Sequence, residues 1–152
     1  MASTDVLVVD TASLAVIHRI IAHEDPLEKC LFSPDSHLLA TFSQKKHRIG
    51  LWDVATWSLI RVFGPEFFYT ARYAPRCVFT ADGSHIITVG GDGDLSVWRV
   101  SSGTKMGEME KTGWVVITPS GWLLATWYCG INASAYYIDK HGKVSLLEEF
   151  SL

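Results

Sequence analysis

The stretch CLFSPDSHLLATFSQKKHRIGLWDVATW, residues 30–57, decides the fold class of this chain. It contains three short runs rich in Leu, Ile, Phe and Trp, and polar turn residues separate them. Short apolar runs bounded by Pro, Asp, Gly and Ser are typical of β-strands joined by turns. The apolar period of three to four residues that indicates helices is almost absent from the chain. The sequence therefore predicts an all-β protein.

The same pattern returns twice further along the chain. Residues 77–103 read CVFTADGSHIITVGGDGDLSVWRVSSG, and residues 115–142 read VVITPSGWLLATWYCGINASAYYIDKHG. In the three units, 20, 19 and 20 residues separate a large apolar residue of the first run from an aromatic residue of the third. Those pairs are Phe32 and Trp52, Phe79 and Trp98, and Ile117 and Tyr137. Successive units start 47 and 38 residues apart, on either side of the ~40–45 residues of a four-stranded propeller blade.

The third run of each unit has apolar residues at both alternating positions, as in RIGLWDV (48–54) and DLSVWRV (94–100). Both faces of such a strand must be covered, which happens when sheets stack face to face. Residues 5–22 align with residues 50–67 at an offset of 45, pairing Thr11 with Thr56 and Leu14 with Leu59. They are therefore predicted to form the last two strands of a blade.

These units predict a single propeller segment of about three and a half blades, fewer than the ~4–8 of single-chain propellers. The chain is then a fragment of a larger propeller, an open propeller with exposed blade edges, or one part of an oligomeric ring. We favour the fragment. The predicted boundaries are 5–22 for the half blade and 23–64, 70–110 and 111–150 for the blades.

Residues FSPDSHLLATFS and IGLWDVATW resemble the core of the WD-repeat β-propellers. His23 stands in the place of that repeat's opening Gly-His, and Trp52 with Asp53 in the place of its Trp-Asp. The second unit keeps Trp98 but has Arg99 after it. The resemblance implies a partial propeller of four-stranded antiparallel blades, held by a His, Ser/Thr, Asp and Trp network. It also implies that loops on the top face bind a protein or peptide.

The stretch GGDGD, residues 90–94, invites a calcium-site interpretation that its spacing contradicts. A calcium loop starting at Asp92 would need a glutamate at its twelfth position, where the chain has Gly103. Asp92 and Gly93 are typical of a tight hairpin turn. The resemblance places Asp92 at the family's turn aspartate, whereas the first unit has Lys46 there.

No motif predicts catalysis, a metal or a cofactor. The six histidines show no ligand spacing. Both His37 and His85 follow the first turn of their units, which we interpret as one recurring structural position. We therefore predict a protein that is not an enzyme.

Charge and cysteine usage exclude several further classes of protein. A net charge of −3 and an isoelectric point of about 6.0 give no reason to expect nucleic-acid binding. No apolar run reaches the ~18 residues of a membrane span. The three cysteines have no metal or disulfide spacing. We expect a cytoplasmic or nuclear protein.

Two loops are candidate partner-binding surfaces. GPEFFYTARYAP, residues 64–75, combines aromatic residues with an arginine, the types that dominate interface hot spots. QKKHR, residues 44–48, places cations on a hairpin tip that could bind an acidic group. Alternatively the aromatics pack beneath their own loop or extend strands, and a charged hairpin tip is more often merely solvated. The candidate residues are Phe67, Phe68, Tyr69, Arg72 and Tyr73 in the first loop, and Lys45, Lys46 and Arg48 in the second.

These features favour a non-catalytic protein–protein interaction or scaffold module. Its partners would be a peptide, the remainder of a propeller, or further copies that associate through open blade edges. A purely structural wall of a larger ring is a second hypothesis. A third arises because IAHEDPLEKCLFSPDSHLLAT (21–41) is similar to propellers that bind phosphoinositides on autophagic membranes. Their Phe-Arg-Arg-Gly motif is replaced by VFGPEF (62–67), so their lipid site is not transferred.

Overall fold

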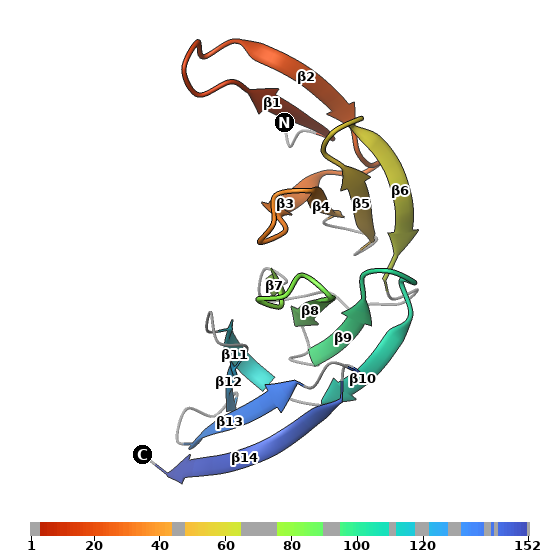
Figure 1. Ribbon diagram of the computed structural model, residues 1–152. Coiled ribbons are helices and arrows are strands. Elements are labelled where there is room, and N and C mark those ends of the chain that lie inside the picture. The colour runs from red at the N-terminus through yellow and green to blue at the C-terminus, as the bar shows by residue number, and fades with distance from the viewer. Residues whose placement is uncertain are drawn as a thin grey trace. The chain divides into compact units, whose positions relative to one another are not determined.

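The strands of the computed structural model are all antiparallel (Figure 1). The structure describes residues 4–43, 48–64, 76–89, 95–109, 112–117, 122–127, 132–138, 141 and 143–151. Within those residues there is no helix, and the strands form one two-stranded and three four-stranded sheets. In each sheet the strands are ordered as they follow along the chain. This confirms the predicted all-β class with blade-like four-stranded sheets.

The chain divides into two compact units, Met1–Phe67 and Phe68–Leu152. The first unit holds β1 (Asp5–Val9) with β2 (Val16–Ile21), and a sheet of β3 (Leu27–Phe32), β4 (Leu38–Ser43), β5 (Ile49–Asp53) and β6 (Ser58–Phe63). The second unit holds a sheet of β7 (Arg76–Phe79), β8 (His85–Val89), β9 (Leu95–Arg99) and β10 (Lys105–Met109). Its other sheet contains β11 (Thr112–Ile117), β12 (Trp122–Trp127), β13 (Asn132–Ile138) and β14 (Val144–Ser151).

The β1–β2 hairpin repeats the β5–β6 hairpin residue for residue. Val8 pairs with His18 and Leu51 pairs with Arg61, and each pair is followed by a register shift. The two hairpins therefore correspond at an offset of 43. The predicted offset of 45 is wrong by two residues, and Leu14 corresponds to Trp57 rather than to Leu59.

An aspartate turn fixes this correspondence. Asp10 Oδ1 accepts hydrogen bonds from the amide and the hydroxyl of Ser13, both at 2.7 Å. Asp53 Oδ1 accepts the same pair from Thr56, at 2.8 and 2.7 Å. The next residue has a positive φ in both turns, 56° at Leu14 and 54° at Trp57. The carboxylate is thus the recurring element, and matching threonine to threonine shifted the alignment.

A second recurring turn joins the first two strands of two sheets. Ser33 donates to Asp35 at 2.5 Å, and Thr80 donates to Asp82 at 2.6 Å. The amides of Ser33 and Thr80 bind the carbonyls of Leu38 and His85, both at 2.9 Å. His85 therefore corresponds to Leu38, which makes the shared position inferred for His37 and His85 wrong.

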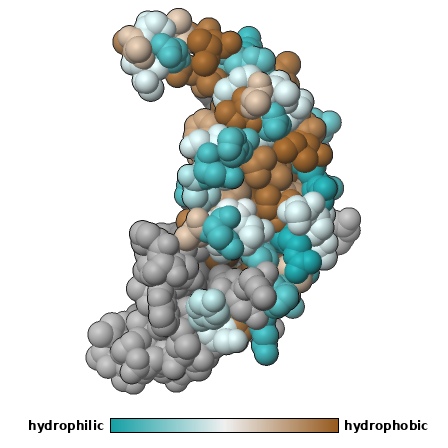
Figure 2. Space-filling view, in the orientation of Figure 1, coloured by the Kyte–Doolittle hydropathy of each residue, from teal (hydrophilic) through white to brown (hydrophobic). Residues whose placement is uncertain are grey.

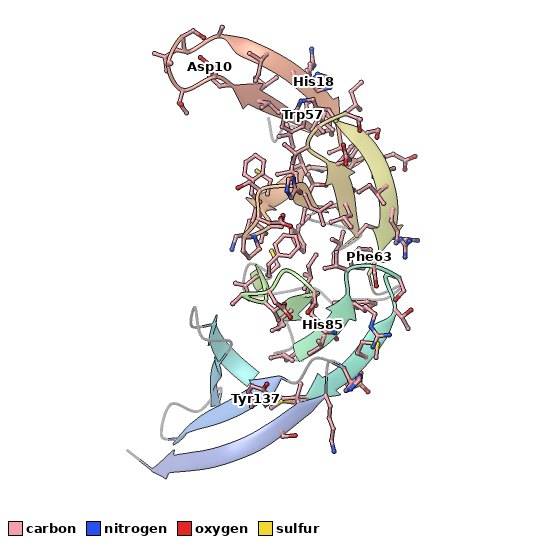
Figure 3. The ribbon with its side chains drawn as sticks, in the orientation of Figure 1. Asp10, His18, Trp57, Phe63, His85 and Tyr137 are labelled. Carbon is pink, nitrogen blue, oxygen red and sulfur yellow. The ribbon has the colours of Figure 1, made fainter. Side chains whose placement is uncertain are left out.

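One buried cluster of the first unit lies between β1–β2 and the sheet that follows it. Ile20, Leu39 and Trp52 form a buried cluster. Val6, Val8, Ala22, Val54 and Trp57 pack against that cluster. The rings of His18 and Trp57 stack across the same contact, with centroids 5.6 Å apart and planes 20° apart (Figure 3). One face of the β1–β2 hairpin thus covers the tryptophan-bearing face of the next sheet.

Burial in the third strands matches their mixed apolar pattern. The residues from Ile49 to Trp52 are all buried, and so are those from Leu95 to Trp98. Ile86 and Ile87 of the neighbouring β8 are 0% and 1% exposed. In the second unit, β11 lies against β8, and Arg99 Nη2 donates to the His141 carbonyl at 3.4 Å. The apolar residues at both alternating positions therefore predicted correctly that both faces of these strands are shielded.

Candidate functional site

The hydroxyl of Thr41 on β4 is completely buried and takes part in three hydrogen bonds. Thr41 Oγ1 accepts a hydrogen bond from Trp52 Nε1 at 3.0 Å and donates to the Gly50 carbonyl at 3.3 Å. It also lies 2.9 Å from His23 Nε2. A hydroxyl has a single hydrogen, and Gly50 receives it, so His23 Nε2 must donate. The network thus holds the neutral histidine in its Nε2–H tautomer.

Gly50 leaves the space in which this network is built. A Cβ at residue 50 would lie 2.7 Å from Thr41 Oγ1, 3.0 Å from Trp52 Nε1 and 3.5 Å from His23 Nε2. Real carbon atoms do not approach so closely without displacing a neighbour. Glycine at this position is therefore required by space rather than by backbone conformation.

Burial dominates the electrostatics of His23. It lowers the pKa of His23 below the ordinary value of 6.5, and a backbone hydrogen bond with Thr41 and the charge of Asp25 oppose this shift. Asp25 is itself buried, with 8% exposure. His23 is therefore neutral in the folded protein at neutral pH.

The first prediction concerns acidification. Because the pKa of His23 is lowered by folding from 6.5, the unfolded chain binds the proton more readily. The contribution of His23 is present above that unfolded value and is lost as the pH falls through the folded pKa. We expect the urea midpoint of unfolding to drop between about pH 7.5 and about pH 5.5, above the range where carboxylates titrate. His23→Gln keeps an N–H donor without a titrating group, so its midpoint should change less. Equal drops in both proteins would contradict this assignment.

The second unit repeats part of the network. Trp98 Nε1 donates to Thr88 Oγ1 at 2.9 Å. Cross-strand pairing puts Ile86 opposite Trp98, as Leu39 lies opposite Trp52. The same pattern places Thr88 where the first sheet has Thr41. A tryptophan on the third strand bonded to a threonine on the second therefore recurs in two sheets.

His85 heads a separate chain of polar contacts at the start of β8. Its Nδ1 lies 2.7 Å from Ser84 Oγ, and Ser84 Oγ donates to both carboxylate oxygens of Asp82 at 2.8 Å. Burial raises the pKa of Asp82, but hydrogen bonds from Thr80 and Ser84 outweigh it and leave that pKa below its ordinary value. The serine hydrogen points to the carboxylate rather than to the imidazole. The arrangement fixes a turn and does not activate a nucleophile.

Asp53, at the position of the WD aspartate, lies at the end of β5 and faces its own turn. Hydrogen bonds from the Thr56 side chain and amide lower the pKa of Asp53. The hydrogen bonds of its carboxylate are therefore local to the β5–β6 turn and separate from the bond that joins Thr41 to Trp52.

Most of the candidate partner-binding residues fall outside the described residues. These are Lys45, Lys46, Phe67, Phe68, Tyr69, Arg72 and Tyr73, together with the turn residue Asp92. Arg48 is described and exposed. Its amide donates to Ser43 Oγ, and its carbonyl accepts from the Ser43 amide, both at 3.0 Å. This pair closes the base of the hairpin that carries residues 44–47.

Sequence reasoning missed the two threonines of the network. Thr41 and Thr88 precede their tryptophans by 11 and 10 residues, at matching places in LLATF and HIITV. That spacing was the signal that could have identified them. Among the described residues, no group of three or more His, Cys, Asp or Glu is placed to hold a metal ion. No helix in that part of the chain is long and apolar enough to cross a membrane.

The sheets and the recurring Trp–Thr bond define an all-β protein built from blade-like four-stranded units. The chain is similar to autophagy-related protein 18 of Meyerozyma guilliermondii, with 29% identity over 96 residues. The match covers 63% of this chain and 16% of the relative, so the chain corresponds to a small part of that protein. No family model matches the chain.

Proposed function

We propose that this chain is a segment of a WD-repeat propeller and works as a non-catalytic protein-interaction module. The observation that carries the proposal is the Trp–Thr bond, at 3.0 Å in one sheet and 2.9 Å in another, at the same register. In these two sheets the bond ties the second strand to the third. The partial similarity to autophagy-related protein 18 supports the same architecture.

The proposed binding surface consists of the two loops singled out in the sequence. Rigid strands position the loops, aromatic residues of 64–75 anchor a peptide, and the cations of 44–48 select an acidic partner. The Ser43–Arg48 pair supports this proposal because it fixes the base of the basic hairpin. We propose one domain with blades at 23–64, 70–110 and 111–150 after a half blade at 5–22, in a cytoplasmic protein.

Affinity capture from cell extract, followed by mass spectrometry, tests the interaction module. Phe67→Ser with Phe68→Ser should remove the captured partners. The matched control, Leu59→Ser with Ile60→Ser, changes two apolar residues of β6 that are 48% and 47% exposed. This control variant should still capture the same partners as the wild type. Capture that is identical for both variants would contradict binding through the aromatic loop.

The alternative is binding of a phosphoinositide at a membrane surface. Two observations favour it, the similarity to an autophagy-related protein and the stretch AHEDPL at residues 22–27. Flotation with phosphatidylcholine vesicles, with and without phosphatidylinositol 3-phosphate, separates the two functions. The interaction module predicts no enrichment on the charged vesicles.

Charge variants complete the flotation experiment. If the charged vesicles enrich the protein and Lys45→Glu with Lys46→Glu abolishes that enrichment, the lipid-binding function replaces the interaction module. Lys29→Glu with Lys143→Glu makes the same change of net charge at two exposed residues outside the hairpin and serves as the control. Enrichment that both double variants reduce equally would reflect net charge alone, and the basic hairpin would then not be the lipid site.

A further inference from the structure

We draw no further inference here: the strongest candidate, the apolar surface of the outer strand β6 (Figure 2), where Leu59, Ile60 and Val62 are 48%, 47% and 44% exposed, carries none because nothing in the part of the chain that the structure describes shows what covers it.

Discussion

Trp52→Ala is expected to destabilise the protein by ~3–5 kcal/mol, the usual loss when a large buried aromatic side chain is truncated. Trp52 is 7% exposed and forms a buried cluster with Ile20 and Leu39. Its Nε1 also supplies a hydrogen bond to the buried Thr41 hydroxyl. The substitution therefore removes apolar contacts and a hydrogen-bond donor together. Since domains are stable by only ~5–15 kcal/mol, we expect the urea midpoint to fall by a large fraction.

Two variants separate the contributions in this prediction. Trp52→Phe keeps most of the apolar contact and removes only the donor, so we expect a loss of about 1–3 kcal/mol. Trp57→Ala removes a partly buried ring that packs against the cluster and stacks on His18, so about 0.5–1.5 kcal/mol for the stack is lost in addition to the apolar contact. We expect Trp52→Ala to cost more than either of these variants. A Trp52→Ala midpoint no lower than that of Trp57→Ala would show that the cluster is not the core of the unit.

Much of this core could be predicted from the sequence, because a strand that is buried on both faces has apolar residues at both alternating positions. In RIGLWDV and DLSVWRV the apolar residues occupy both alternating positions, and the structure buries four successive residues in each strand. Trp52 and Trp98 were identified in the same way, since a large aromatic recurs at a nearly constant distance from the first strand. A repeated unit must bury the same positions each time, and this makes the positions visible.

The turn geometry was harder to predict from the sequence, because few residues determine it and the residues beside them vary. The turn at Asp10 is set by a carboxylate that accepts from Ser13. Leucine does not favour a positive φ, so nothing in the residue type of Leu14 indicates its conformation. The alignment that paired Thr11 with Thr56 used residue identity and missed the carboxylate.

The polar network was only partly predictable for a related reason. His23 and Trp52 were found because their residue types are distinctive, whereas threonine is common in strands and gives no signal alone. Thr41 becomes recognisable only beside Thr88, when the cross-strand pairing of each with the third strand is known. His37 and His85 show the converse. They stand at neighbouring positions of the aligned units and have the same residue type, but His37 is exposed and His85 is buried.

Gly50→Ala is the second large expected effect. We expect it to lower the free energy of unfolding, whereas the same change elsewhere in a strand usually raises it. In an open strand this change stabilises a protein by roughly 0.5–1 kcal/mol, because glycine loses more backbone entropy on folding. Here the new Cβ would lie 2.7 Å from Thr41 Oγ1 and 3.0 Å from Trp52 Nε1. Thr41 is completely buried and paired with Gly50 across the strands, so it cannot turn away. We expect a loss of about 1–3 kcal/mol, as for other overpacked cores, measured by urea unfolding.

A double-mutant cycle identifies the clash as the cause. Thr41→Ala removes the oxygen that the new methyl group meets, so Gly50→Ala should cost less in that background than in the wild type. Ser96→Ala provides a matched comparison in the second sheet. Ser96 lies opposite Thr88 as Gly50 lies opposite Thr41, but it already carries a Cβ and Thr88 is only partly buried. Ser96→Ala should therefore change stability little. A Gly50→Ala protein as stable as the wild type would mean that the space around Thr41 is wider than the structure shows, and additive losses in the cycle would assign the effect to the backbone instead.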